Sequence, residues 1–532
     1  MSSDSALAPL RLPVFRMLWG AWMVANVCMW MNDVAAAWLM TSLSASPVMV
    51  ALVQTASTLP VFLLGLPSGA LADILDRRRW FVATQIWVAL VGLVTAMVVL
   101  SDAMSPALLL ALTFANGIGL AMRWPVFAAI VPELVPRAQL PAALALNGIA
   151  MNASRIVGPI VAGALIASAG SPYVFGLNAV LSIAAGVVIW RWRREPKPAS
   201  ALPGERFVGA MRVGVQYVRQ SLRMRAALLR VALFFLQSAG LLALLPLVAR
   251  RLQDGGAGTF TVLLAAMGTG AIGAALLLPR LRDALSRDAL VRYGSLLQAL
   301  ATLAVALAPN VWVAAPSMLV AGIAWMSVAN TLTVSAQLAL PDWVRARGMS
   351  IYQMALMGGA AGGAALWGQV ASWTDVRTSL LLSAALGALA MLMASRRWSI
   401  EGGAEDDDLT PAPPWAWAPT ALAVEPDAGP VLVTIEYCID PARAPEFRTL
   451  MQHSRRARLR HGALAWELFN DVSDPGRFIE YFIDESWVQH LRRFDRVTAG
   501  DVALRERRLA FHLGEQPPKV SRFIAADVAG RA

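Results

Sequence analysis

From residue 15 to residue 395 the chain alternates between long apolar stretches and short polar connections. Each stretch is long enough for a helix of about 20 residues, the length needed to cross the hydrocarbon core of a bilayer. Six stretches lie at 15–40, 47–72, 80–100, 105–130, 142–169 and 173–191, and six more at 226–249, 258–279, 289–308, 312–336, 349–371 and 378–395. The pattern predicts an all-α polytopic membrane protein with twelve transmembrane helices.

Charged residues lie almost entirely in the connections, and they alternate along the chain. Connections rich in Arg lie at 73–79, 133–137, 191–225, 279–288, 342–347 and 396–397. The connections between them are short and nearly uncharged, apart from Arg250 and Arg251. Because Arg-rich connections stay on the cytoplasmic side, we expect a multi-pass protein of a bacterial inner membrane with both termini in the cytoplasm.

The composition supports a membrane protein and argues against a nucleic-acid partner. The chain has 532 residues, 57% of them hydrophobic and 15% charged, with a formal net charge of +11. Soluble globular proteins carry about 25% charged residues, so much of this surface is expected to face the lipid bilayer. Cys28 and Cys438 lie far apart and have neither disulfide nor metal spacing. We expect no metal and no cofactor.

Two pairs of similar short strings indicate that the membrane region consists of two halves. The string PELV, which begins at Pro132, and the string PDWV, which begins at Pro341, both follow an apolar stretch and precede an Arg. Gly117 and Gly322, each followed by Ile, lie upstream at similar offsets. A parallel repeat of six helices produces such internal sequence similarity. The expected organisation is two six-helix pseudo-repeats at 1–195 and 226–398, separated by a cytoplasmic loop at 196–225.

The connection after the second stretch, GALADILDRRR from Gly69 to Arg79, is the most specific string in the chain. It resembles the signature loop of the major facilitator superfamily, and the resemblance extends over residues 10–395. It implies that Gly69 lets two helices approach closely and that Asp73, Arg77 and Arg78 form a charged gate. Ile74 and Asp76 depart from the family pattern. Alternatively, the three Arg residues serve only as topology anchors.

Two further strings resemble the enterobactin-exporter branch of that superfamily. One runs from Trp30 to Ala56 (WMNDVAAAWLMTSL to QTA), and the other is NASRIVGP, from Asn152 to Pro159. Gly158, Pro159 and Gly163 resemble the fifth-helix motif of antiporters in the superfamily, although Ala162 replaces one of its paired glycines. The motif favours export over symport. Ordinary packing of small residues is the alternative explanation.

Ionisable residues inside a membrane are costly and are functional candidates. Asp33, Arg123 and Arg155 are the three predicted proton-coupling residues, because a carboxylate whose distance from an Arg changes can take up and release a proton. The family resemblance associates the position of Arg123 with proton handling. The alternatives are a structural helix-to-helix hydrogen bond for Asp33 and an interfacial, snorkelling Arg123. All four His residues lie beyond residue 395, so a histidine relay within the membrane is excluded.

Aromatic and Met side chains on the first helix suit an adaptable apolar cavity. We expect Met29, Trp30 and Asn32 to line the substrate pocket, because they lie beside Asp33 in the sequence. Contact with lipid and an interfacial aromatic belt is the alternative for the other Trp residues of this helix.

The segment after the membrane region reads as a separate soluble domain. Residues 399–430 are acidic and rich in Pro, which is typical of a linker. Residues 431–532 show the order β-α-β-β-α-β of a ferredoxin-like domain, in which Asp440 is the expected N-cap of the first helix. The domain resembles the small antibiotic-biosynthesis monooxygenases that pair into α/β barrels, which implies dimerisation. His453, His461, His490 and Trp487 are candidates for a pocket in this domain.

The predicted function is proton-driven export of a small amphipathic molecule by alternating access. The expected partners are the small-molecule substrate, protons and lipid, and no catalytic residues are assigned. A proton-linked importer is one alternative. A membrane-anchored enzyme of the monooxygenase type, acting through the C-terminal domain, is the other. The sequence leaves open whether the substrate is a siderophore, a drug or a metabolite.

Overall fold

The computed structural model describes residues 7–74, 76–136, 139–192, 207–252, 255–401, 408–412 and 424–526. By internal contacts the chain divides into two compact units. A membrane unit comprises 1–197, 227–334 and 350–397, and a second unit comprises 198–226, 335–349 and 398–532.

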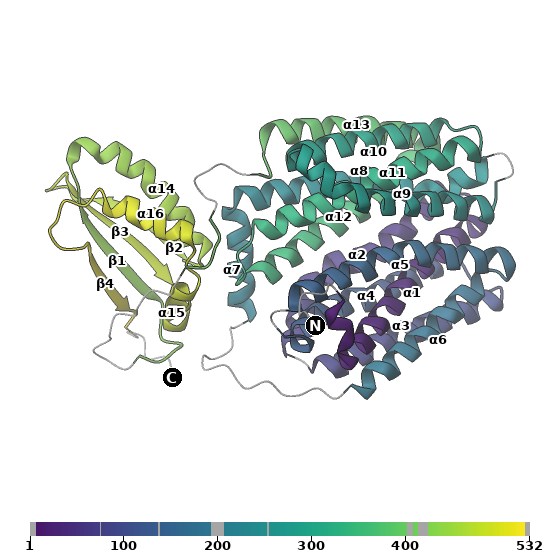
Figure 1. Cartoon of the computed structure of the whole chain (residues 1–532), viewed down its shortest axis with the longest axis horizontal. Helices are drawn as coiled ribbons and strands as arrows, with labels where there is room; N and C mark the ends of the chain where they lie inside the picture. Colours follow the sequence, from purple (N-terminus) through teal and green to yellow (C-terminus); the bar gives the residue numbers. More distant parts are fainter. Residues whose placement is uncertain are drawn as a thin grey trace. The chain divides into compact units, whose positions relative to one another are not determined.

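Two groups of six long helices form the membrane unit, preceded by the short helix η1 (Ala8–Arg11) (Figure 1). The first group is α1 (Pro13–Leu43), α2 (Pro47–Ile74), α3 (Arg77–Leu100), α4 (Pro106–Leu134), α5 (Leu140–Ser168) and α6 (Ser171–Arg191). The second is α8 (Leu222–Arg251), α9 (Ala257–Ala284), α10 (Arg287–Leu307), α11 (Val311–Leu338), α12 (Arg345–Trp373) and α13 (Val376–Arg397).

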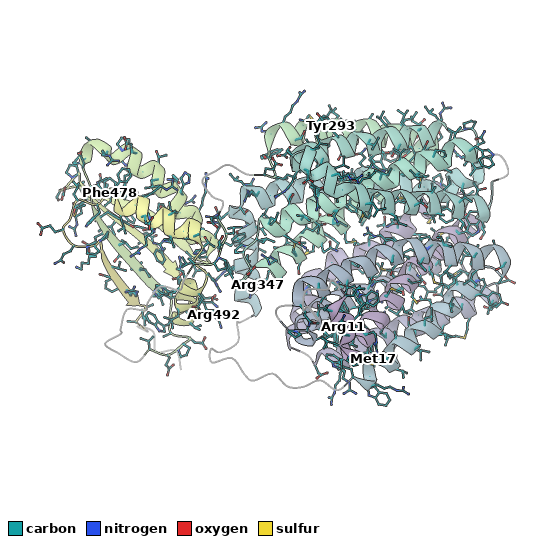
Figure 2. All side chains as sticks on the ribbon, in the orientation of Figure 1. Arg11, Met17, Tyr293, Arg347, Phe478 and Arg492 are labelled. Carbon is teal, nitrogen blue, oxygen red and sulfur yellow. The ribbon has the colours of Figure 1, made fainter. Side chains whose placement is uncertain are left out.

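In the described residues, 11 helices are long and apolar enough to cross a membrane. The other long helix, α12, has 29 residues, and its many glycines together with Gln353 and Gln369 make it less apolar. Large apolar side chains are exposed on the outer helices, among them Leu90 on α3 and Ile183 on α6. Tyr293 on α10 likewise points outward (Figure 2). The predicted polytopic α-helical fold is confirmed.

Capping residues explain where several of these helices begin. The first backbone N–H groups of a helix lack partners within it, and a side-chain oxygen at the N-cap can accept from one of them. Ser105 accepts from Leu108 N at 3.2 Å at the start of α4. Asp76, which departs from the family pattern, accepts from Arg79 N at 2.8 Å at the start of α3. Asp76 therefore has a structural task at this position.

The two glycines of the similar strings, Gly117 and Gly322, lie at corresponding helix crossings in the two halves. A Cβ on Gly117 of α4 would lie 2.7 Å from Ser57 O of α2. A Cβ on Gly322 of α11 would lie 1.9 Å from Met267 O of α9. Each crossing joins the fourth helix of a half to the second. In each half a glycine of the fourth helix thus permits a close approach to the second helix.

The second unit contains a helix that the sequence analysis did not predict. Residues 196–225 were expected to form only a loop, yet α7 spans Phe207–Gln220. Val213, Tyr217 and Val218 are buried, at the spacing of one face of a helix. Helix α7 contacts the C-terminal part of the chain, where Gln216 Nε2 donates to Ala463 O at 2.6 Å.

The C-terminal part of the second unit is a small α+β domain. Its elements are β1 (Val431–Cys438), η3 (Pro441–Arg443), α14 (Ala444–Arg460), β2 (Ala465–Asn470), β3 (Arg477–Asp484), α15 (Trp487–Asp495), α16 (Ala499–Leu509) and β4 (Lys519–Ile524). The sheet order is β2-β3-β1-β4 with all neighbours antiparallel. Helices α14 and α16 lie on one face of the sheet (Figure 1).

Burial alternates along β3 and at the two ends of β1, so that one face of these central strands supplies the core. Val433 on β1, together with Phe478 and Phe482 on β3, packs against Phe447 of α14. Asp440 is an N-cap as expected, but of η3, where it accepts from Ala442 N at 2.9 Å. This single turn then leads into α14.

Candidate functional site

Asp33 lies on α1 beside a small cavity between the two halves of the membrane unit. Its Oδ1 accepts a hydrogen bond from Ser57 Oγ of α2 at 2.7 Å. The cavity is lined by Asp33, Ala37, Val50, Val53, Gln54, Ser57, Leu242 and Ala243. The helix-to-helix hydrogen bond of the alternative interpretation is therefore present. The same carboxylate also borders a space that elements of both halves enclose, which is where a proton carrier is needed.

Arg155 of α5 lies between two Trp rings that belong to different halves. The carbon of its guanidinium group is 5.3 Å from the centre of Trp30 on α1 and 4.2 Å from the centre of Trp325 on α11. Cation–π contacts of this kind stabilise a desolvated Arg. In the described residues Arg155 makes no hydrogen bond or ion pair. Trp325 was not a sequence candidate, because no pattern in α11 indicates which side faces the other half.

Arg123 of α4 is directed into the first half of the membrane unit. It is 3% exposed, its Nη1 donates to Ala25 O at 3.2 Å, and its guanidinium lies 5.3 Å from the ring of Trp22. Trp22 in turn stacks on Phe127 at 4.0 Å. A snorkelling side chain would reach the bilayer surface, and Arg123 does not.

The three predicted pocket residues face different neighbours. Trp30 contacts Arg155 and is close to Gly158, whose Cβ would lie 2.5 Å from the Cβ of Trp30. Asn32 is buried and accepts from Asn178 Nδ2 of α6 at 3.3 Å, so it packs within the first half. Met29 is partly buried. Met29 and Asn32 are not in the lining of the cavity beside Asp33.

The antiporter-like string on α5 lies where two close helix crossings occur. Gly158 permits the contact with α1 described above. A Cβ on Gly163 would lie 2.0 Å from Thr261 Oγ1 of α9, in the second half. Pro159, between them, is buried. Gly163 is thus required for the observed contact between the halves.

Several contacts between the halves lie at the helix ends remote from Arg191, the last residue of α6. Trp38 of α1 stacks on Phe260 of α9 at 5.7 Å, and Arg250 lies 5.1 Å from the ring of Trp38. One hydrophobic cluster at these ends contains buried residues of both halves. Of the described clusters, the one at the opposite ends contains residues of the first half alone.

The predicted gate is described only in part. The surroundings of Gly69 and the side chains of Asp73 and Arg77 lie outside the described residues, although the backbone of all three belongs to α2 and α3. Arg78 donates from Nη2 to Trp190 O at the end of α6. Arg78 therefore joins α3 to α6 within the first half.

A buried ion pair in the second half was missed by the sequence analysis. Arg230 of α8 is 0% exposed and pairs with Asp288 at the start of α10. The sequence did contain a signal for this pair, because Arg230 lies within the apolar stretch 226–249 and Asp288 immediately precedes the apolar stretch 289–308. Arg230 therefore has a carboxylate partner, whereas Arg155 has none among the described residues.

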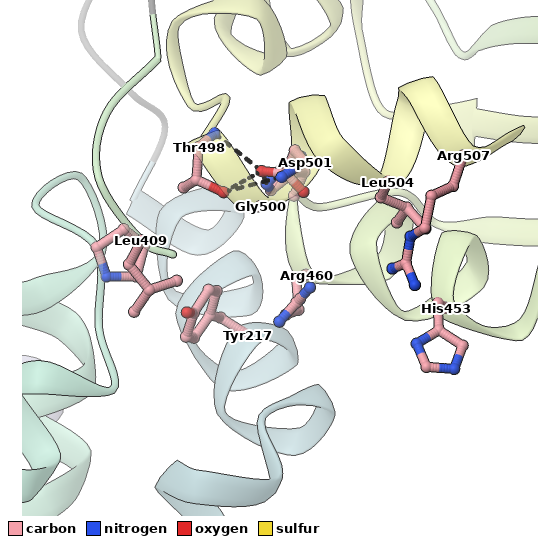
Figure 3. Close-up of a pocket in the computed structure, with 11 residues that line it drawn as sticks. Tyr217, Leu409, His453, Arg460, Thr498, Gly500, Asp501, Leu504 and Arg507 are labelled. Atoms are coloured by element: carbon pink, nitrogen blue, oxygen red, sulfur yellow. Dashed lines mark hydrogen bonds and ion pairs between the residues drawn. The ribbon is translucent and has the colours of Figure 1, made fainter. Parts of the chain in front are cut away.

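The second unit contains a pocket where α7 meets the C-terminal domain. Tyr217 of α7, Arg460 of α14 and Asp501 of α16 converge on it (Figure 3). Two predicted His residues contribute, His453 and His461. His461 Nε2 lies 3.3 Å from Asp501 Oδ2. Burial is the main cause that lowers the pKa of His461 below its ordinary value, although Asp501 opposes it.

The loop between α11 and α12 packs against α7 and the C-terminal domain through Trp343. The ring of Trp343 lies 5.8 Å from that of Tyr217 and 6.1 Å from that of His461. The guanidinium of Arg496 lies 4.7 Å from the Trp343 ring. Arg212 of α7 also forms an ion pair with Glu485 at 2.7 Å. The C-terminal domain thus contacts segments that continue directly into α8 and α12.

Two buried carboxylates organise the core of the C-terminal domain. Glu480 of β3 is 0% exposed. Its hydrogen-bond donors are the side chains of Tyr437, Ser454, Arg458, Trp466 and Arg508. Burial alone would raise the pKa of Glu480, but Arg458, Arg508 and these hydrogen bonds hold it at about 2.

The second buried carboxylate accounts for another predicted pocket residue. Asp484 Oδ2 lies 2.9 Å from Nδ1 of His490, and Arg493 pairs with its other oxygen. Burial opposes ionisation of Asp484, yet Arg493 and His490 lower its pKa below the ordinary value. His490 therefore belongs to the core of the domain. In the described part of the chain, no three His, Cys, Asp or Glu residues are placed to hold a metal ion.

Relatives and solved structures similar to the chain are membrane transporters. Macrolide efflux protein A of Streptococcus pyogenes is 25% identical over 242 residues, which cover 44% of this chain and 58% of that protein. The Staphyloferrin A transporter of Staphylococcus aureus is 22% identical over 256 residues, which cover 47% and 63%. The chain thus spans less than two thirds of the length of these curated relatives.

The structural comparisons identify the same fold. A bacterial homologue of the human lysosomal transporter Spinster, in an inward-facing and occupied conformation, matches with a TM-score of 0.58 and 16% identity, over 74% of this chain and 99% of that one. A mutant of the nucleoside transporter NupG matches with a TM-score of 0.60 and 13% identity, over 72% and 98%. At these identities the likeness shows the fold alone. The family model described as a transmembrane secretion effector matches residues 4–529, and the chain therefore belongs to this family of the major facilitator superfamily.

Proposed function

We propose that the protein exports a small amphipathic molecule across a bacterial inner membrane in exchange for protons. The observation that carries the proposal is Asp33, a carboxylate beside a cavity that both halves enclose. In the sequence it is the only acid in the middle of a long helix. A carboxylate there is costly when charged, so its protonation can be linked to which side the cavity faces.

Alternating access needs two halves that separate at one end and meet at the other. The hydrophobic cluster shared by both halves lies at the ends remote from the Arg-rich connections. With those connections in the cytoplasm, the conformation is one in which the periplasmic end is closed. The signature-loop residues Gly69, Asp73, Arg77 and Arg78 would then close the cytoplasmic end in the other state.

Export is favoured over proton-linked import by the relatives of the chain. The family is described as a secretion effector, and one relative is named for macrolide efflux. The Staphyloferrin A transporter keeps siderophores among the candidate cargoes, in accord with the resemblance to enterobactin exporters. Import remains the competing function, with the opposite direction of flux.

The cargo can be sought by an untargeted comparison of small molecules. A strain that lacks the gene is compared with the same strain complemented by the wild-type gene, and small molecules in the medium and in the cells are quantified by mass spectrometry. An exporter predicts compounds that disappear from the medium and build up in the cells. A compound that instead builds up in the medium of the deletion strain would identify an importer.

Gly163→Ala is expected to impair transport by weakening the closed end. The new Cβ would meet Thr261 Oγ1 at 2.0 Å, and overpacking of this kind costs about 1–3 kcal/mol. The state in which α5 and α9 touch becomes less populated, and the transport rate falls about tenfold. Gly148→Ala on the same helix is the control, because nothing lies within 4 Å of its Cβ. Thr261→Gly should restore transport in the double variant, and a failure to do so would contradict the steric explanation.

The C-terminal domain is proposed to be ferredoxin-like and to mediate dimerisation. Helices cover one face of its sheet, and the other face carries Phe469 of β2 and Phe523 of β4, both more than half exposed. Phe469 stacks on Tyr481 of the neighbouring strand at 5.5 Å. A second copy of the same face would cover these rings, as in the paired barrels of the monooxygenases that the domain resembles.

Replacing both Phe469 and Phe523 by Ser is expected to convert a dimer into a monomer, because it removes the apolar surface that drives association. The mass of the detergent-solubilised full-length protein, measured by light scattering, reports the change. Val472→Ser is the control, since Val472 is fully exposed in the β2–β3 turn. A wild-type protein that is monomeric at all accessible concentrations would exclude dimerisation through this face.

A further inference from the structure

The Arg155 cluster, defined as Arg155 with Trp30 and Trp325, carries hydrogen-bond donors that lack acceptors. Arg155 Nε, Trp30 Nε1 and Trp325 Nε1 are all buried without a partner in the described residues. Buried polar groups are normally hydrogen-bonded, and an orphaned one costs free energy. All three orphaned atoms are donors. The cluster therefore has a deficit of acceptor atoms.

The charged residues around the Arg155 cluster also include fewer anions than cations. Arg123 and Arg155 are set against a single acid, Asp33, in the middle of the first half. Asp33 is engaged by Ser57 and forms no ion pair with Arg155 among the described residues. Arg123 has the carbonyl of Ala25 as a partner. An unpaired cation in a membrane is expensive, so an anionic partner would be strongly favoured at Arg155.

The geometry also selects against cationic cargo. Trp rings bind cations through their faces, but the faces of Trp30 and Trp325 are already in contact with Arg155. A cationic ligand would have to displace the guanidinium and would be repelled by it. A ligand with a flat conjugated ring and an anionic oxygen would instead stack beside the Trp rings and accept from Arg155.

We propose that the Arg155 cluster is the recognition site for the cargo and that the cargo is an organic anion with a conjugated ring. The proposal rests on the export function above and specifies its substrate class. Because Trp30 and Arg155 belong to the first half and Trp325 to the second, a ligand held here would contact both halves. Its binding would therefore depend on their relative position.

Equilibrium binding to the purified full-length protein in nanodiscs tests this without any gradient. Fluorescein and rhodamine 6G share one ring system but are an anion and a cation, and fluorescence anisotropy reports the binding of each. The wild-type protein should bind fluorescein at least about tenfold more tightly than rhodamine 6G. Arg155→Gln should weaken fluorescein binding by about tenfold or more and leave rhodamine binding unchanged or stronger. Arg155→Lys should retain more of the fluorescein affinity than Arg155→Gln does.

Arg292→Gln is the matched control. Arg292 also forms a cation–π contact, with Tyr293 at 4.8 Å, but both residues belong to α10 and Tyr293 is exposed on its outer side. It should change neither affinity by more than about twofold. Preference of the wild type for rhodamine, lack of binding of both dyes, or an Arg155→Gln variant that binds fluorescein normally would each overturn the proposal. Export is tested separately, by measuring flux. A protein that does not use protons can therefore still pass this binding test.

Discussion

Asp33→Asn is expected to abolish proton-driven export while the protein remains abundant in the membrane. The amide has almost the same shape and can still accept the hydrogen bond from Ser57 Oγ, which spans 2.7 Å in the wild type. It cannot gain or lose a proton. Packing of α1 against α2 is therefore retained, and only the chemistry of the carboxylate is removed.

Two measurements separate loss of coupling from loss of the protein. Accumulation of exported compounds in everted membrane vesicles under a pH gradient should fall to the level of vesicles without the protein. Exchange of the same compounds down their own gradient, which requires no net proton movement, should continue. Asp102→Asn is the control, because Asp102 is an exposed loop residue with φ of 54°, a conformation that Asn tolerates. Normal gradient-driven accumulation by Asp33→Asn would remove this residue from the mechanism.

Glu480→Gln is expected to destabilise the C-terminal domain by about 3–5 kcal/mol, because it leaves buried charges uncompensated. The two cations are Arg458, 3.0 Å from Glu480, and Arg508, 3.2 Å from it. Hydrogen exchange of the full-length protein measures the effect on the amides of β3, while the membrane helices serve as an internal reference. Glu436→Gln is the control. Glu436 pairs with Arg477 at the surface of the same sheet at 3.0 Å, and such exposed pairs contribute less than about 1 kcal/mol.

The same carboxylate predicts how the domain responds to acid. The folded pKa of Glu480, about 2, lies below the ordinary value of 4.5. A lowered folded pKa means that the stabilisation is complete above the ordinary value and is lost as the pH falls from there towards 2. Exchange protection of β3 should therefore decline between these pH values in the wild type, and Glu480→Gln should show a smaller decline. An equally steep decline in both proteins would show that other groups cause the acid sensitivity.

The membrane fold could be predicted from the sequence because its physical signal is strong and local. A helix in lipid must satisfy its own backbone and be apolar over its length, so the stretch at 80–100 closely matches α3 (Arg77–Leu100). The C-terminal strands were also predicted, because a sheet with one buried face alternates in polarity. Helix α7 was missed, since Arg and Gln between its apolar residues resemble a polar loop.

The candidate site was predictable only residue by residue. Asp33 and Arg155 are conspicuous because charges are rare in apolar stretches. Their partners depend on how helices distant in the sequence rotate against one another, which no local pattern specifies. Trp325 could not be assigned to Arg155, nor Ser57 to Asp33, for that reason. Asn32 was grouped with Trp30 by sequence proximity, but two residues along a helix lie about 200° apart around its axis, so Asn32 faces α6.

Accumulation in everted vesicles tests the central claim, that protons flowing through the protein drive a small molecule out of the cell. The vesicles are given a total small-molecule extract of the producing cells and an imposed gradient, acidic inside, and their contents are analysed by mass spectrometry. At least one compound should accumulate with the wild-type protein, and it should not accumulate when the gradient is collapsed with nigericin or when Asp33 is replaced by Asn. Accumulation that ignores the gradient, or that occurs only in right-side-out vesicles, would contradict the account.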